Sequence, residues 1–192
     1  MSQSLPPCSI LLLAGGRGQR MGGRDKGLVD WQDRPLIEHV HAVARPLTDD
    51  LIISCNRNLD RYRRYADHLA SDHEADYPGP LAGVLAGLAV ARHAWVVVLA
   101  CDAPRIDRLL IDDLRLAASR HAQAAMVRQG GHWQPMFSVV PRQALQALQR
   151  AWDSGERSLQ RVLMELGVQA VDCREDDARL DNFNSPQWLQ PQ

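Results

Sequence analysis

Short apolar runs recur along the chain and alternate with longer stretches whose apolar residues are spaced as on one face of a helix. Each run is four to six residues long, rich in aliphatic side chains and bounded by glycine, proline or polar residues. This pattern is typical of buried β-strands. We predict strands at residues 10–13, 51–54, 95–100, 124–127, 136–140 and 168–171.

The intervening stretches predict helices on both faces of a sheet. Pro35 stands at a first-turn position of one helix, and Asp107 suits the N-cap of another. The helix at 81–92 is apolar nearly all round, which predicts burial, and Gly83 and Gly87 would let it approach the sheet closely. Alternation of strand and helix predicts an α/β fold with three layers and a mostly parallel, twisted sheet. The predicted helices cover residues 35–45, 81–92, 106–120, 141–152 and 158–166.

The composition is ordinary for a soluble globular protein, and the length of 192 residues predicts a single domain over residues 1–192. With 22 Lys and Arg against 23 Asp and Glu, the net charge of −1 argues against nucleic acid or an acidic membrane as a partner. The first residues lack a secretory signal pattern, and no apolar run is long enough to span a bilayer. Four widely spaced cysteines predict reduced thiols in a cytoplasmic protein.

The first predicted strand leads directly into a glycine-rich segment that carries four cations. Glycine lets backbone N–H groups approach a ligand, and successive N–H groups form a concave anion site. The segment therefore predicts a cradle for a polyphosphate. It is not a Walker A loop, because Gly27 follows Lys26, nor a dinucleotide fingerprint, because Met21 stands where the third glycine belongs. The glycines are Gly15, Gly16, Gly18, Gly22 and Gly23, and the cations are Arg17, Arg20, Arg24 and Lys26.

Polar residues also follow the second and third predicted strands, and ligands of open parallel sheets bind beyond the carboxyl ends of the strands. Asn56 and Arg57 could hydrogen-bond a base, a ribose or a phosphate, although a plain polar loop explains them as well. Asp102 directly follows an apolar strand, and a carboxylate shared with substrate phosphates and water is what Mg²⁺ prefers. The turn at Gly79 could present backbone N–H groups to a ligand or simply cap the following helix.

Together these segments resemble the molybdenum cofactor guanylyltransferases (molybdopterin-guanine dinucleotide synthases) of the nucleotidyltransferase superfamily. The resemblance runs from about residue 10 to residue 186, with the motifs in the same order and at similar spacing. The first motif is typical of the superfamily, and the others narrow the resemblance to the molybdopterin branch. The motifs are Leu13-Ala14-Gly15-Gly16, Arg20-Met21-Gly22 and Lys26, then Asp72, Gly79-Pro80-Leu81-Ala82-Gly83, Cys101-Asp102 with Pro104, and Asn182-Phe183-Asn184-Ser185-Pro186.

This resemblance implies a Rossmann-like nucleotidyltransferase fold whose N-terminal half binds the nucleotide and whose C-terminal half binds mainly molybdopterin. The implied reaction transfers GMP from GTP to the terminal phosphate of molybdenum-molybdopterin and releases pyrophosphate, with Mg²⁺ as cofactor. The implied catalytic residues are Arg20, Lys26 and Asp102, and Asp102 also binds the metal. The implied nucleotide-binding residues are Leu13, Ala14, Gly15, Gly16, Lys26, Ser54, Asn56, Asp72, Gly79 and Asp102, and Asn182 and Asn184 lie at the pterin side.

The resemblance also implies transient contacts with proteins of molybdenum cofactor biosynthesis or molybdoenzyme maturation. Ser54 stands where the family commonly has asparagine, so a molybdopterin cytidylyltransferase that uses CTP is an alternative. Sugar-1-phosphate nucleotidyltransferases fit less well, because their chains are usually longer. A non-catalytic cofactor-binding or delivery module is a further alternative. Lys26 and Asp102 argue against it, because a pure binder needs neither transition-state charge nor a metal.

Three further segments have more than one interpretation. Residues 130–135 form either a flexible loop, whose Trp133 could stack on a pterin or a guanine, or a surface hairpin. Residues 154–158 suit a loop between helices near the second substrate, and residues 57–64 are better explained by a solvated helix than by a docking face. The histidines show no metal-ligand spacing, so neither zinc nor a histidine base is predicted.

Overall fold

The computed structural model describes residues 5–14, 24–71 and 79–183, and its centre is a seven-stranded sheet in the order β5-β4-β1-β6-β8-β7-β9. Neighbouring strands are parallel except where β8 pairs, antiparallel, with β6 and β7. The mostly parallel α/β sheet predicted from the sequence is therefore confirmed. Its strands are β1 (Cys8–Leu13), β4 (Leu51–Ser54), β5 (His68–Ala70), β6 (Trp95–Ala100), β7 (Ala124–Gln129), β8 (His132–Pro141) and β9 (Val168–Cys173).

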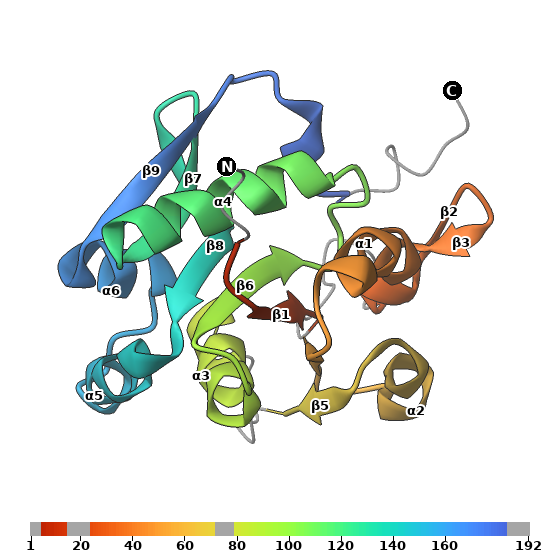
Figure 1. Cartoon of the computed structure of the whole chain (residues 1–192). Helices are drawn as coiled ribbons and strands as arrows, with labels where there is room; N and C mark the ends of the chain where they lie inside the picture. The colour runs from red at the N-terminus through yellow and green to blue at the C-terminus, as the bar shows by residue number, and fades with distance from the viewer. Residues whose placement is uncertain (1–4, 15–23, 72–78, 184–192) are drawn as a thin grey trace.

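Helices cover both faces of this sheet (Figure 1). Side chains along β1 alternate between the two faces, as the strand repeat requires: Ile10 and Leu12 belong to one buried cluster, and Leu11 and Leu13 to the other. The first cluster includes residues of α1 (Leu36–Ala44), α2 (Leu59–Tyr62) and α4 (Arg108–His121). The second includes residues of α3 (Pro80–Val90), α5 (Leu145–Asp153) and α6 (Leu159–Leu166).

All six predicted strands and all five predicted helices are present, with boundaries shifted by a few residues. Asp107 is the N-cap of α4, and its carboxylate accepts a hydrogen bond from the backbone N–H of Leu110 at 2.9 Å, as predicted. α5 starts later than predicted, because a 3₁₀ turn (Arg142–Ala144) precedes it. No helix among the described residues is long and apolar enough to cross a membrane.

The sequence analysis missed β5 and a two-stranded hairpin of β2 (Asp30–Trp31) and β3 (Arg34–Pro35). Their two- and three-residue strands are too short to show a repeat. The hairpin also turns through Gln32 and Asp33, which both have positive φ, whereas turns of this kind usually reveal themselves by glycine or asparagine.

The flexible loop predicted at 130–135 is a two-residue turn, so the hairpin alternative is correct. Gly130 and Gly131 both have positive φ and join β7 to β8 directly, with Trp133 opposite Arg128 in the strand pairing. A two-residue turn of this hand needs positive φ at both positions, which adjacent glycines supply at little cost. β8 consequently begins at His132 rather than at 136.

The G-x-x-x-G pattern of α3 serves close packing on the sheet, as predicted. A Cβ added to Gly83 would lie 2.8 Å from Ser54 Oγ, and one added to Gly87 would overlap the side chain of Leu11. Seven of the eleven residues of α3 are buried. The apolar pattern overstated the burial, because Ala89 and Val90 at the C-terminal end are exposed.

We therefore expect Gly87→Ala to destabilise the protein by roughly 1–2 kcal/mol, although alanine is the better helix former by about 1 kcal/mol. Leu11 is fully buried and cannot move aside to accept the added methyl group. Urea denaturation measures the change in the free energy of unfolding. Ala89→Leu, which adds bulk at an exposed position of the same helix, is the control and should change that free energy by less than about 0.5 kcal/mol. A Gly87→Ala protein more stable than wild type would contradict the close approach.

Candidate active site

Three neighbouring parallel strands end level with one another. Leu13 of β1 pairs with Ser54 of β4 on one side and with Ala100 of β6 on the other. The backbone N–H of Ala14 donates to the Ser54 carbonyl at 2.8 Å, and that of Cys101 donates to the Leu13 carbonyl at 3.2 Å. The residues that follow these strands therefore share one edge of the sheet, where ligands of open α/β sheets bind.

Lys26 and Asp102 meet at this edge, as two residues of one site should. Lys26 begins a 3₁₀ turn (Lys26–Leu28), and its Nζ lies 3.5 Å from Oδ2 of Asp102. The carboxylate is almost buried, with 12% of its side chain exposed, and the lysine side chain is 26% exposed. Lys26 is also the only lysine among the 22 basic residues of the chain. The pair thus joins a partly exposed cation to a nearly buried carboxylate at the strand ends.

The segment after β4 lies against the segment before Lys26. Arg57 donates from Nη2 to the backbone carbonyl of Arg24 at 3.1 Å, and its Nε lies 3.7 Å from Oδ2 of Asp25. Asn56 is half-buried and, in the sequence, lies between the end of β4 and Arg57. The predicted Asn56 and Arg57 pair therefore borders the cation-bearing segment.

The side chain of Ser54 faces α3 rather than the strand-end edge. Its hydroxyl is directed at Gly83, and the residue is 2% exposed. The backbone carbonyl of Ser54 accepts a hydrogen bond from the backbone N–H of Ala14. A direct contact of the Ser54 hydroxyl with a nucleotide stays a prediction.

Gly79 is the N-cap of α3 and has φ +101°, a conformation that favours glycine. A Cβ on Gly79 would lie 3.7 Å from the backbone oxygen of Arg157, so the loop at 154–158 lies beside this turn. The guanidinium of Arg157 stacks on Trp152 at 3.8 Å and donates to the Trp152 carbonyl at 2.8 Å. The Gly79 turn and the loop predicted near the second substrate are therefore neighbours.

The end of the described chain returns to Asp102. The backbone N–H of Phe183 donates to the Asp102 carbonyl at 2.8 Å, which places Asn182 beside the carboxylate-bearing loop. The Asn182 side-chain oxygen is buried and accepts no hydrogen bond from any described residue. A buried amide oxygen of this kind suits a ligand or a metal, because a buried acceptor without a donor is costly.

Sequence reasoning missed the residues that hold this returning segment. Arg105 forms an ion pair with Asp181 at 2.9 Å, and its guanidinium lies over the rings of Phe183, at 5.4 Å, and Trp31, at 6.0 Å. Trp31 meets Phe183 edge to face at 5.0 Å. These contacts join the β2–β3 hairpin, the loop after β6 and the C-terminal segment. No local pattern reveals them, because the partners lie far apart in the sequence.

Several predicted residues cannot be placed. Arg20, Gly15, Gly16, Asp72 and Asn184 lie outside the described residues. Leu13 and Ala14 are described, and both are buried.

Two buried cysteines flank the site and are unsuited to nucleophilic chemistry. Burial raises the pKa of the Cys55 thiol to about 11, and burial raises the pKa of Cys101 well above its ordinary value. Both thiols are therefore protonated near neutral pH, whereas a thiolate is the reactive form.

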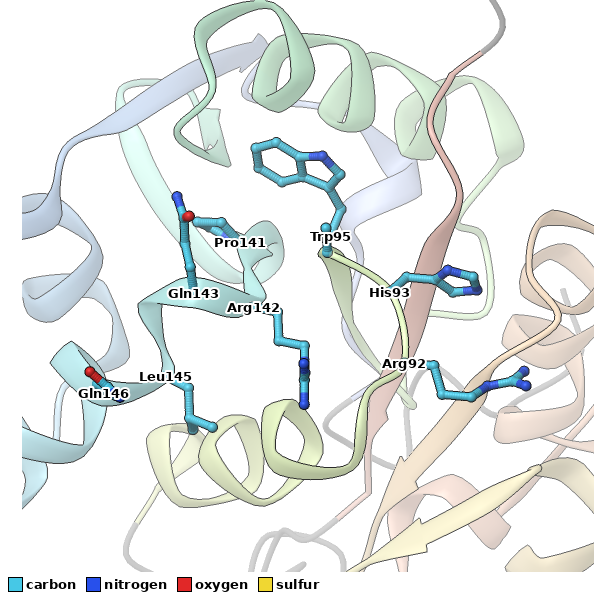
Figure 2. Close-up of a pocket in the computed structure, with 9 residues that line it drawn as sticks. Arg92, His93, Trp95, Pro141, Arg142, Gln143, Leu145 and Gln146 are labelled. Carbon is cyan, nitrogen blue, oxygen red and sulfur yellow. The ribbon is translucent and has the colours of Figure 1, made fainter.

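A separate cavity of about 720 Å³ lies at the opposite edge of the sheet, where β6 begins and β8 ends (Figure 2). Figure 2 shows Leu145 and Arg142 pointing toward α3, and Trp95 pointing away from them. No residue predicted for the nucleotide, the pterin or a metal lines this cavity. The size of a cavity therefore does not identify the functional site in this protein.

A mostly parallel sheet, a cation and a carboxylate at its carboxyl edge, and a helix that begins there at a glycine turn define an α/β domain of the nucleotidyltransferase type. The chain belongs to the family of the MobA-like NTP transferase domain, whose model matches residues 10–171.

Two relatives share most of their sequence with this chain, and both are named molybdenum cofactor guanylyltransferase. The protein of Pseudomonas putida strain GB-1 is 64% identical over 190 residues, which cover 99% of this chain and 100% of the relative. The protein of Pseudomonas aeruginosa strain LESB58 is 59% identical and covers 97% of this chain and 94% of the relative.

Solved structures share the fold at low sequence identity. Molybdopterin-guanine dinucleotide biosynthesis protein A of Archaeoglobus fulgidus superposes with a TM-score of 0.76 at 22% identity, covering 94% of each chain. The 2-C-methyl-D-erythritol 4-phosphate cytidylyltransferase of Thermus thermophilus superposes with a TM-score of 0.74 at 18% identity, covering 95% of each chain. The fold alone therefore does not select the base of the nucleotide.

The raised pKa of Cys55 predicts a loss of stability at high pH. The folded state holds the thiol proton up to about pH 11, against 9.0 for the free group, so the stabilisation is complete below pH 9 and is lost as the pH rises through about 11. We expect the free energy of unfolding to fall over this range by roughly 1–3 kcal/mol more in wild type than in Cys55→Ala. Urea titrations at several pH values measure how the free energy of unfolding changes with pH in each protein. The cavity that Cys55→Ala leaves costs the same at every pH, so it does not affect this comparison. Equal losses in both proteins would contradict the shift.

Proposed function

We propose that this protein transfers GMP from GTP to the terminal phosphate of molybdenum-molybdopterin, releases pyrophosphate and forms the molybdopterin guanine dinucleotide cofactor. The observation that carries this proposal is the 64% identity, over nearly the whole chain, to a protein named molybdenum cofactor guanylyltransferase. The pairing of Lys26 with Asp102 at the carboxyl edge of the sheet supports it, because a nucleotidyl transfer needs positive charge and a metal-binding carboxylate at one place.

In the proposed reaction, an oxygen of the molybdopterin phosphate forms a bond to the α-phosphorus of GTP, and the bond from that phosphorus to the bridging oxygen of the β-phosphate breaks. The protein contributes mainly position and charge, since such transfers need little covalent help. Lys26 would neutralise the charge that develops on the departing pyrophosphate, with Arg20 as its predicted companion. The backbone from Ala14 onward would hold the nucleotide phosphates.

Lysine suits this role better than arginine. The chain uses arginine at 21 of its 22 basic positions and lysine only at position 26. An ammonium is a compact charge on a flexible stem, whereas a guanidinium is a planar fork that prefers fixed bidentate partners. A flexible, compact charge is better able to follow a phosphate as it leaves.

The residues present fit a magnesium ion. Asp102 offers a nearly buried carboxylate whose described ion pair with Lys26 is long, and Mg²⁺ usually takes one or two carboxylates together with substrate phosphates and water. The described residues contain no group of three or more Asp, Glu, His or Cys side chains that could hold a metal by themselves. When bound, the ion would neutralise phosphate charge and align the two reactants.

The pterin would lie on the side of Asn182. The buried amide oxygen of Asn182 lacks a donor among the described residues and stands next to the loop of Asp102. A donor from the pterin or from a metal-bound water would satisfy it. We expect the protein to act in the cytoplasm and to make transient contacts with proteins of molybdenum cofactor biosynthesis or molybdoenzyme maturation.

Calorimetry of GTP, CTP and ATP, each with and without Mg²⁺, tests the choice of nucleotide. We expect GTP to bind at least about tenfold more tightly than CTP or ATP, which corresponds to about 1.4 kcal/mol, and to bind more tightly with Mg²⁺. Asp102→Ala should abolish both this effect of Mg²⁺ and the metal-dependent transfer activity. A preference for CTP would make the protein a cytidylyltransferase with the same site. Absence of nucleotide binding would favour a delivery module, and full activity of Asp102→Ala would remove Asp102 from the site.

We expect Lys26→Ala to lower turnover by about 10²–10³-fold while GTP affinity changes by less than about tenfold, because the charge that Lys26 opposes develops mainly in the transition state. Steady-state kinetics and calorimetry of the same preparation separate the two effects. Lys26→Arg retains the charge and should recover only part of the rate. Unchanged turnover with weaker GTP binding would overturn this role.

A further inference from the structure

We propose that Asp25 is a positioning residue that fixes Lys26 opposite Asp102. This inference rests on the proposed function, because it concerns the geometry of the same reaction. Asp25 directly precedes Lys26 and is itself only 9% exposed. Its carboxylate points toward the segment after β4.

Both oxygens of the Asp25 carboxylate are bound by that segment. Oδ1 accepts a hydrogen bond from the hydroxyl of Tyr62 at 2.5 Å, and Oδ2 accepts one from the amide of Asn58 at 2.9 Å. The Nε of Arg57 lies 3.7 Å from the same Oδ2. A carboxylate with three partners in a buried place is held in one orientation, since loss of any partner leaves a buried polar group unsatisfied.

The other neighbour of Lys26 is fixed against the same tyrosine. A Cβ on Gly27 would lie 2.6 Å from the Tyr62 hydroxyl and 3.1 Å from the sulfur of Cys101. Tyr62 lies in α2 and is fully buried, and Cys101 directly precedes Asp102 in the chain. The backbone is therefore held on both sides of Lys26, by hydrogen bonds at Asp25 and by close contact at Gly27.

These contacts link the three places that the reaction needs. Asn58 and Arg57 belong to the segment after β4, Cys101 to the end of β6, and Asp25 to the segment that carries Lys26. The groups after β4 bind both Asp25 oxygens, and the ammonium of Lys26 meets Asp102. The tyrosine keeps its proton, since burial raises the pKa of Tyr62 far above its ordinary range. The phenol thus remains a donor to Asp25 at all relevant pH values.

Asp50 supplies a matched control at the opposite edge of the sheet. It is also a buried aspartate, with no exposed surface, and accepts hydrogen bonds from Ser9 Oγ at 2.5 Å and from the Arg92 backbone N–H at 2.8 Å. Asp50→Asn and Asp25→Asn therefore disturb comparable buried networks, but only Asp25 adjoins Lys26. Tyr62→Phe is a second test, because it removes one bond to Asp25 without changing any charge.

The kinetic experiment compares these variants in the GMP-transfer assay. We expect Asp25→Asn and Tyr62→Phe to lower kcat by at least about tenfold with KM for GTP within about threefold, because a misplaced catalytic group affects the transition state most. Asp50→Asn should lower the melting temperature but leave kcat of the folded protein unchanged. Unchanged kcat in Asp25→Asn, or an equal fall in Asp50→Asn, would overturn the proposal.

A second readout does not depend on activity. Labelling with ¹⁵N-lysine gives one side-chain ammonium resonance by NMR, because Lys26 is the only lysine. In the otherwise wild-type protein, Asp102→Asn should shift this resonance, since it removes the negative charge that faces Lys26. In the Tyr62→Phe background the same change should have less than half this effect, because Lys26 no longer faces position 102. An undiminished effect would overturn the positioning role.

The two proposals fail in different ways. If wild type prefers CTP or transfers no nucleotide, the guanylyltransferase function fails, and the NMR coupling together with calorimetry of inorganic pyrophosphate still decides the role of Asp25. We then expect Asp25→Asn to weaken pyrophosphate binding by at least about threefold relative to Asp50→Asn, as a displaced cation would. If wild type transfers GMP and Asp25→Asn matches it in kcat and in Lys26 coupling, the function stands and the positioning role fails.

Discussion

The level ending of β1, β4 and β6 is the constraint on which the site depends. Parallel register pairs Leu13 with both Ser54 and Ala100, and these strands are covered by helices on both faces, so their aliphatic side chains tolerate no slip. A shift of one residue would exchange the two buried faces of β1. The same register that buries the core therefore delivers Asn56 and Asp102 to one edge, and the site inherits its geometry from hydrophobic packing.

A seam of small residues sets the depth at which α3 lies on this sheet. Gly83 sits against the Ser54 hydroxyl and Gly87 against Leu11, so the helix approaches more closely than any larger residue would allow. Because α3 begins at Gly79, that depth also fixes where the turn stands relative to the strand ends and to the loop that carries Arg157. Ser54 contributes to the site in this way through its small size and its backbone carbonyl, whatever its hydroxyl contacts.

The strands and helices with a periodic apolar pattern, and the polar residues that follow the strands, could be predicted from the sequence. Aliphatic runs identified all the long strands, and Asp102 followed from its place after one of them. The alternation of side chains along β4 also predicts which face of the sheet Ser54 lies on. Ile52 packs with residues of α3, and Ser54, two residues later, is on the same face. Contacts among Trp31, Arg105 and Phe183, and those of Asp25 with Tyr62, join distant segments and leave no periodic signal. They depend on the finished fold, and only the structure reveals them.

Arginine and lysine form different kinds of ion pair in this chain. Some arginines in the described part form short, forked pairs with carboxylates, as Arg128 does with Asp172 at 2.6 and 2.9 Å. The pair of Lys26 with Asp102 is longer, at 3.5 Å, and is made by a group with no fixed geometry. A carboxylate that must also bind a metal, and a cation that must also meet a phosphate, require an interaction that exchanges partners readily. The hydrogen-bonded network around Asp25 complements this longer pair, because it fixes the backbone of Lys26 and leaves the direction of the ammonium to the flexible side chain.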